Sequence, residues 1–352
     1  MGQNVIISDL FRRDLAAAIS ECEHDRTFVL VDETTRVKCW ERIKDCFSLK
    51  GARLVTVGAT DSCKTVETLI EVWKALQEGG ATRHSLLVNL GGGMVTDLGG
   101  FAASTFKRGI NFINVPTTLL AMVDASVGGK TGVNFGGLKN EIGVFNDASF
   151  VLLDTGWLKT LDEENIRSGY AEMLKHGLIA DEAMWAELAD FDLAQPDLAQ
   201  LSTMIGKSVR VKERIVEEDP KEHGIRKALN FGHTIGHAYE SLSFKKDRPL
   251  LHGHAVAAGI VSELYLSHKV CGFPMEKLSQ VVYYLKEYYP AFVFDCKDYD
   301  TLYELMTHDK KNEAGVINFT LLSQVGDVQI NQQVSKEKIL ESLDFYRESF
   351  GV

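Results

Sequence analysis

The sequence lacks the features of a membrane-embedded or secreted protein. No stretch approaches the roughly 18 uninterrupted apolar residues that cross a bilayer. The opening segment MGQNVIISDLFRRDL contains no apolar core long enough for a signal peptide. The six cysteines form no Cys-x-x-Cys pair, which is typical of scattered reduced thiols rather than of a disulfide framework. We therefore expect a cytoplasmic protein that has no membrane partner.

Positive charge is also scarce. The chain has 38 lysines and arginines against 49 aspartates and glutamates, a formal net charge of −11, and no long basic run. This balance argues against a nucleic-acid partner. It leaves an anionic small substrate open, because a pocket can be locally basic on an acidic protein.

The 352 residues exceed what one hydrophobic core usually serves. Up to about residue 155, strand-like runs alternate with helical stretches, which predicts a parallel sheet with helices on its faces. The strands are expected at 28–31, 54–57, 85–90 and 111–115, with helices at 65–76 and from the glycine-rich turn to Phe106.

Helical periodicity dominates the rest of the chain. Helices are predicted at 166–179, 199–217, 228–243, 254–270, 275–288 and 335–348, and one strand pair at 317–322 and 328–330. The sequence therefore predicts an α/β domain at residues 1–158, followed by a mostly helical domain at 159–352.

Three glycines, Gly91 to Gly93, separate a predicted strand from a predicted helix. Backbone amides at such a turn can approach a pyrophosphate, and the helix dipole favours an anion. The spacing departs from G-x-G-x-x-G, so a tight turn without a ligand stays open. Asp32 ends another strand, where it could accept from ribose hydroxyls or simply cap a turn.

The segment 123–140 has five glycines within ten residues, which excludes a helix interior. Its lysines and asparagine, set in backbone that permits close approach, suit a phosphate or carboxylate. The alternative is a glycine-rich surface loop with solvated lysines.

Six of the ten histidines fall between positions 223 and 268. His233 and His237 are four residues apart and would share a helix face. Together with Glu172, His252 and His254 they favour a divalent metal, because imidazole and carboxylate ligands suit zinc with one position left open. Spacing alone favours His233 and His237 as a pair of ligands on one helix, whereas His252 and His254 could instead form a cap and turn at a helix start.

Eight motifs, in this order, resemble the 3-dehydroquinate synthase family of sugar-phosphate cyclases. They are GGGMVTDLGGFAAS, FKRGINFINVPTTLLAMVDASVGGKTGVN, LKNEIGVF, LDTGWLKTL, SGYAEMLKHG, ALNFGHTIGHAYE, LHGHAVAAG and HDKKN, and they span roughly residues 90–315. The resemblance implies a Rossmann-like NAD domain, a helical metal domain, an active site between them and a homodimer.

The resemblance also implies the site residues. The metal, zinc or cobalt, would be bound by Glu172, His233 and His252. NAD would be bound by Asp32, Asp61, Lys64, Gly92, Gly93, Asp97, Thr117, Thr118, Lys130, Lys139 and Thr160. Catalytic positions fall on Asp124, Lys130, Asn140, Lys175, Arg226, Asn230 and His237, with His237 in proton transfer. Substrate-binding positions fall on Lys139, Lys212, Lys310, Lys311 and Arg108, the last reaching the neighbouring subunit's site.

The activity implied is that of a phosphate-eliminating lyase of the shikimate pathway, which serves aromatic amino acid biosynthesis. A phosphorylated sugar acid, 3-deoxy-arabino-heptulosonate 7-phosphate, would become 3-dehydroquinate and phosphate. The steps are transient oxidation by NAD, phosphate elimination, re-reduction and intramolecular aldol closure. The alternatives are a cyclase of the valiolone or 2-deoxy-scyllo-inosose type, a glycerol-dehydrogenase-like polyol oxidoreductase, and a metal-binding scaffold without catalysis.

Two residues depart from the family pattern. Asp61 stands three residues before Lys64, where the family usually has glutamate. A shorter carboxylate there would reshape the adenosine end of the NAD site. His254 stands in the His-Gly-Glu-Ala-Val motif at the glutamate position, and whether it touches the metal stays open.

Overall fold

The computed structural model describes residues 3–136, 138–246, 249–307 and 316–352. The chain forms two compact units. The first contains Met1–Asp162 and Leu198–Glu213, and the second contains Glu163–Asp197 and Arg214–Val352. The division therefore falls within one long helix, α8 (Leu198–Glu218).

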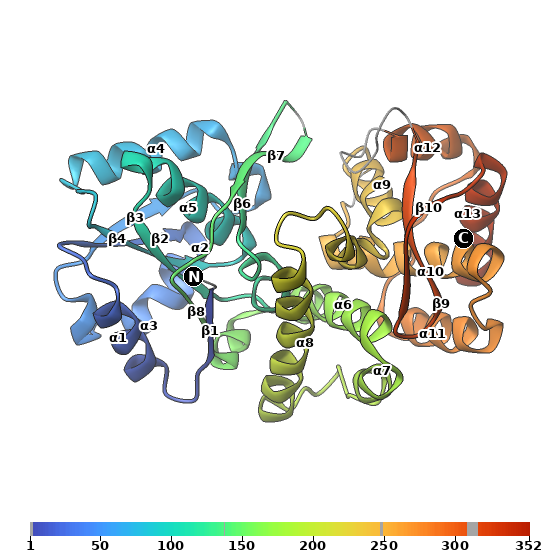
Figure 1. The fold of residues 1–352 in the computed structure, drawn as a ribbon, viewed down its shortest axis with the longest axis horizontal. Helices are drawn as coiled ribbons and strands as arrows, with labels where there is room; N and C mark the ends of the chain where they lie inside the picture. The colour runs from blue at the N-terminus through green and yellow to red at the C-terminus, as the bar shows by residue number, and fades with distance from the viewer. Residues whose placement is uncertain (1–2, 137, 247–248, 308–315) are drawn as a thin grey trace. The chain divides into compact units, whose positions relative to one another are not determined.

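The first unit is built on a six-stranded sheet in which every pairing is parallel. Its order is β1-β8-β5-β4-β2-β3, and Figure 1 draws its strands in blue to green. The strands are β1 (Asn4–Ile7), β2 (Thr27–Asp32), β3 (Arg53–Val57), β4 (Leu86–Gly91), β5 (Asn111–Pro116) and β8 (Phe150–Leu153). Helices α1 (Phe11–Glu21), α4 (Val66–Glu78) and α5 (Gly93–Thr105) connect them, and α2 (Glu33–Thr35) and α3 (Glu41–Ile43) are single turns.

The topology of this sheet creates a natural binding point. The chain leaves β2 for β3 on one side and leaves β4 for β5 on the other, although β2 and β4 are neighbours. Ligands of open parallel sheets bind beyond the carboxyl ends of the strands at such a switch point. Asp32 and the turn after Gly91 lie at these two strand ends.

The four predicted strands of this unit are confirmed, but three further features were not predicted. The four-residue strands β1, at the edge of the sheet, and β8, beside it, are too short for a periodicity that separates them from loops. The glycine-rich segment is no plain loop: it forms an antiparallel hairpin of β6 (Lys130–Phe135) and β7 (Leu138–Phe145). Gly128 and Gly129 precede it with positive φ, which explains part of its glycine content.

The second unit is mostly helical, as predicted. Its helices are α6 (Glu163–Ala180), α7 (Glu182–Ala189), the end of α8, α9 (His233–Ser243), α10 (His252–Cys271), α11 (Met275–Tyr288), α12 (Tyr299–Thr307) and α13 (Lys336–Phe350). The predicted strand pair is confirmed as β9 (Asn318–Gln324) and β10 (Asp327–Gln333). Among the described residues, no helix has the length and apolarity that a membrane crossing requires.

One helix boundary was predicted wrongly. The helix expected at 228–243 begins only at His233, and Ile225–Asn230 forms a separate 3-10 turn. Gly232 causes the break, because its φ of 78° is left-handed and cannot continue a right-handed helix. The break places His233 in the first turn of α9.

Glycines allow α9 and α10 to pack very closely. A Cβ added at Gly259 would lie 2.1 Å from the Gly232 carbonyl oxygen and 2.6 Å from the Gly236 nitrogen. At the start of α10, a Cβ at Gly253 would lie 1.7 Å from the Ser168 carbonyl oxygen of α6. Close contacts between backbones therefore join α6, α9 and α10.

We expect Gly259→Ala to lower the free energy of unfolding by about 3 kcal/mol, because the added methyl group collides with backbone atoms that cannot rotate away. Gly272→Ala is the control on the same helix. It has open space but a φ of 79°, so it should cost only about 1 kcal/mol. Urea unfolding measures both, and equal losses would contradict the packing argument.

Candidate functional site

Five of the predicted NAD residues lie at the carboxyl ends of β2, β4 and β5, namely Asp32, Gly92, Gly93, Thr117 and Thr118. Gly92 is the N-cap of α5 and provides no side-chain cap. A Cβ on it would lie 3.1 Å from Cγ2 of Thr118, and the Thr117 amide donates to the Gly91 carbonyl at 2.9 Å. The start of α5, which has no side-chain cap, therefore faces the carboxyl end of β5. This arrangement suits an anionic group.

Asp32 already has a structural task in this fold. Its carboxylate accepts from the Thr35 amide at 2.7 Å, and the Asp32 amide donates to Oγ1 of Thr35 at 2.9 Å. These two bonds form a capping box at the start of α2. Asp32 therefore forms the turn cap that was one of the two alternatives from the sequence. Contact between Asp32 and NAD stays a prediction.

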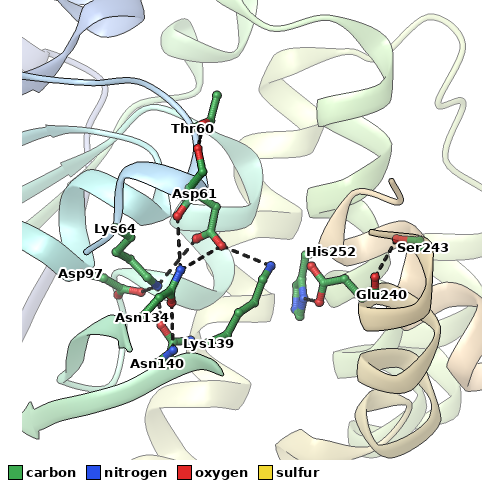
Figure 2. Close-up of polar contacts among 11 residues, drawn as sticks. Thr60, Asp61, Lys64, Asp97, Asn134, Lys139, Asn140, Glu240, Ser243 and His252 are labelled. Carbon is green, nitrogen blue, oxygen red and sulfur yellow. Dashed lines mark hydrogen bonds and ion pairs between the residues drawn. The ribbon is translucent and has the colours of Figure 1, made fainter. Parts of the chain in front are cut away.

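A cluster of polar residues joins α5 to the β6–β7 hairpin (Figure 2). The Lys64 ammonium lies 2.8 Å from the Asp97 carboxylate and donates to the Asn140 side-chain oxygen. Lys64 is 4% exposed. Burial raises the pKa of the Asp97 carboxyl, and the charge of Lys64 opposes this shift. The pair is therefore a buried ion pair, in which each charge depends on the other.

The same cluster contains one residue that the sequence did not single out. Asn134 donates to the Asp61 carbonyl at 3.2 Å, and its side-chain oxygen accepts from the Asn140 amide at 2.9 Å. Lys139 lies 3.2 Å from the Asp61 carboxylate. The hairpin thus brings Lys139 and Asn140 close to Asp61. The contacts of Asn134 depend on this hairpin, which was not predicted from the sequence.

The other predicted residues of the first unit have contacts of their own. The Lys212 ammonium contacts the Asp124 carboxylate and also donates to the Asp124 backbone carbonyl oxygen at 2.6 Å. Thr160 donates to the Trp157 carbonyl at 2.8 Å, and Lys130 starts β6 with an exposed side chain. Arg108 is exposed, has a φ of 70° and lies before the amino end of β5, whereas Thr117 and Thr118 follow the carboxyl end of that strand.

The predicted metal residues of the second unit come together. His233, His237 and His252 each offer a nitrogen within 4.8 Å of the others. Oε1 of Glu172, which is completely buried, lies 3.3 Å from Nε2 of His233 and 3.5 Å from Nε2 of His252. Three helices supply this group, α6, α9 and α10.

Hydrogen bonds orient two of these imidazoles. Nδ1 of His233 is 3.0 Å from the Phe231 carbonyl, so Nδ1 donates and Nε2 is the nitrogen that faces Glu172. Nδ1 of His252 is 3.2 Å from the Glu240 carboxylate. Histidine ligands of metals characteristically donate their second nitrogen in this way. The donor set therefore fits a divalent ion such as zinc at the two Nε2 atoms and Glu172.

The charges in this group are strongly coupled. Burial raises the pKa of the Glu172 carboxyl, but the neighbouring Lys175 and His233 outweigh burial and hold the pKa well below its usual range. Burial lowers the pKa of His252, but the carboxylates of Glu240 and Glu172 outweigh it and raise the pKa to about 10. The site therefore holds an ionised carboxylate, which a metal needs.

Glu240 was missed as a functional residue. It is 3% exposed and lies one turn after His237, inside a motif that was examined only for histidines. We expect Glu240→Gln to weaken zinc binding about 10- to 100-fold, because an amide holds His252 less well than a carboxylate does. Chelator competition measures this affinity. An unchanged affinity would remove Glu240 from the site.

His254 faces away from this group into other contacts. Its ring packs edge-on against Tyr289 with centroids 5.7 Å apart, and burial lowers its pKa while Glu164 opposes the shift. His254 is therefore a buried packing residue of α10, and among the described residues the three-histidine group does not include it.

Arg226 and Asn230 lie in the turn before α9. Arg226 is 2% exposed and donates to the Pro220 carbonyl at 2.6 Å, and Asn230 donates to Glu222 at 2.9 Å. Lys175 is 1% exposed and contacts Glu172. The predicted substrate residues Lys310 and Lys311 lie outside the described residues.

Comparison with known proteins covers nearly the whole chain. Residues 54–168 match the family model described as 3-dehydroquinate synthase N-terminal, and residues 169–312 match the one described as 3-dehydroquinate synthase C-terminal. A 3-dehydroquinate synthase of Parabacteroides distasonis is 63% identical over 350 residues, 99% of each chain. Another, of Clostridium tetani, is 39% identical over 289 residues, 80% of this chain and 75% of that protein.

Solved structures share the fold. ValA, a 2-epi-5-epi-valiolone synthase from Streptomyces hygroscopicus subsp. jinggangensis 5008 with NAD+ and Zn2+ bound, has a TM-score of 0.87 and 27% identity, covering 99% of this chain and 97% of that one. A 2-deoxy-scyllo-inosose synthase complexed with carbaglucose-6-phosphate, NAD+ and Co2+ has a TM-score of 0.87 and 24% identity, covering 98% and 96%. By its two matched regions and its relatives, the chain belongs to the 3-dehydroquinate synthase family.

Proposed function

We propose that this protein is a 3-dehydroquinate synthase. It converts 3-deoxy-arabino-heptulosonate 7-phosphate to 3-dehydroquinate and phosphate, uses NAD and a divalent metal, and acts as a homodimer to which Arg108 contributes across the subunit boundary. The observation that carries the proposal is the group of Glu172, His233 and His252, in which both Nε2 atoms face one carboxylate oxygen, in a chain 63% identical to a 3-dehydroquinate synthase.

The residues of the second unit would hold and activate the substrate hydroxyls. When bound at Glu172, His233 and His252, the metal supplies a Lewis acid, and NAD supplies reversible hydride transfer. His237 lies one turn after His233, with its ring 5.3 Å from that ring. It would move a proton at the oxidised hydroxyl, because neutral imidazole is accessible near pH 7.

The cationic residues would bind the anionic ends of the substrate. Arg226 gives a bidentate match to a carboxylate or phosphate, whereas Lys130, Lys139 and Lys212 give point charges. Three lysines and an arginine suit a substrate that carries both a carboxylate and a phosphate. They would have no comparable role in binding the uncharged substrate of a polyol oxidoreductase.

A comparison of substrates tests the proposal. The purified protein with NAD and zinc should release phosphate from the heptulosonate phosphate. It should release far less from sedoheptulose 7-phosphate or glucose 6-phosphate, since neither offers a carboxylate to the arginine and lysines. Preference for sedoheptulose 7-phosphate or glucose 6-phosphate would instead identify a cyclase of the valiolone or inosose type.

A further inference from the structure

A buried carboxylate on α10, that of Glu263, has no part in the site described above. The Glu263 side chain is completely buried. Its Oε2 accepts from the Gly232 amide at 2.7 Å, and its Oε1 accepts from the Ile235 amide at 2.9 Å. Both amides belong to the first turn of α9, so one carboxylate of α10 binds the amino end of another helix.

These two bonds replace a cap that α9 lacks. The N-cap of α9 is Gly232, which provides no side-chain cap. The first amides of a helix have no partners within the helix and need acceptors when buried. In a capping box two residues of the same helix supply these bonds, whereas here Glu263 supplies both from outside and adds a negative charge at the positive end of the helix dipole.

The capped turn is the one that presents the metal group. His233 is the first residue of α9 and lies between the two amides that Glu263 binds. Gly259, one turn before Glu263 on α10, is the glycine that lets α9 approach. The position of Nε2 of His233 relative to Glu172 therefore depends on the Glu263 carboxylate.

We propose that Glu263 is a positioning residue of the metal site: it holds the first turn of α9 so that His233 reaches the ion bound by Glu172 and His252. The inference rests on the metal-dependent function proposed above. A neutral amide at this position could accept only one of the two bonds, and its own N–H groups would face an N–H donor. The first turn of α9, which carries His233, would shift to separate these two N–H groups.

Zinc affinity tests this inference without any measurement of activity. The dissociation constant of zinc is measured by competition with a chromophoric chelator for the full chain, Glu263→Gln and Glu263→Asp. We expect Glu263→Gln to raise the constant about 10- to 100-fold and Glu263→Asp, which keeps the charge on a shorter side chain, to raise it less. The visible spectrum of the cobalt-loaded protein should shift in the same order.

Ser262→Ala is the matched control. Ser262 is the adjacent residue of α10, is also completely buried, and bonds Tyr239 of the same α9 at 2.9 Å, but away from the first turn. Urea unfolding of the metal-free proteins measures how far each variant destabilises the fold. Ser262→Ala should lose stability while its zinc dissociation constant stays within about twofold of the parent value.

Two results would overturn the inference. One is a zinc affinity of Glu263→Gln within about twofold of the parent, whatever the loss of stability. The other is an equal loss of affinity in Ser262→Ala, which would show general loosening. Should Glu263→Gln not fold, Glu263→Asp decides by the same criteria. A parent protein that binds no zinc or cobalt would contradict the proposed function, so the two failures are distinguishable.

Discussion

Glu172→Gln is expected to abolish stoichiometric zinc binding and to lower kcat at least about 1,000-fold, because the reaction depends on the bound ion. Glutamine has nearly the same shape as glutamate but offers no charged ligand atom. The buried carboxylate is the point at which α6 meets the Nε2 atoms of His233 and His252, at 3.3 and 3.5 Å. The substitution also leaves the buried Lys175 ammonium without its ion-pair partner.

Elemental analysis after gel filtration checks this prediction. Glu182→Gln is the control, because Glu182 forms an exposed ion pair with Lys277 and is 58% exposed. Its metal content and kcat should match those of the parent. A Glu172→Gln protein that retains one zinc per chain would contradict the ligand set.

Lys64→Met is expected to lower the free energy of unfolding by about 3 kcal/mol, because it leaves the Asp97 carboxylate uncompensated in a buried position. Asp97→Asn should also destabilise the fold. The double variant should recover about 2 kcal/mol of the summed loss, since neither charge then remains. Both single variants and the double variant should bind NAD more weakly, because Asp97 lies one turn after Gly93 in α5 and Lys64 is its ion-pair partner.

The pH dependence of this loss has a definite sign. Burial raises the pKa of Asp97 in the folded state above that of the unfolded chain, so the folded state binds the proton more tightly and stability falls as pH rises through the raised pKa. The deficit of Lys64→Met should therefore shrink as the pH is lowered and Asp97 becomes protonated. Additive losses in the double-variant cycle, or a deficit independent of pH, would contradict an ion pair.

The sequence predicted the long elements because their patterns are local. The parallel strands β2 to β5 read as continuous apolar runs and α10 as a long periodic helix. Strands β1 and β8 have four residues each, and they depend on pairing with distant segments: β1 with β8, and β8 with both β1 and β5. The β6–β7 hairpin was missed because its glycines resemble a loop, although they also permit close backbone approach.

The same distinction between local patterns and contacts of distant residues applies to the site. The motifs singled out Glu172, His233 and His252, and the structure brings them together from three helices. The sequence left open whether His254 joins these predicted ligands, and the structure places it against Tyr289 instead. Glu240 and Glu263 could not be assigned from the sequence, because their roles consist of contacts with residues 12 and about 30 positions away.

The release of phosphate under limiting NAD tests the central claim most directly. The metal-loaded protein is incubated with the heptulosonate phosphate in large excess over NAD, and phosphate and NADH absorbance are followed together. The account predicts many phosphates released per NAD with no net accumulation of NADH, because each hydride taken from the substrate is returned. Accumulation of NADH in step with substrate consumption, or no phosphate release from this substrate, would contradict it.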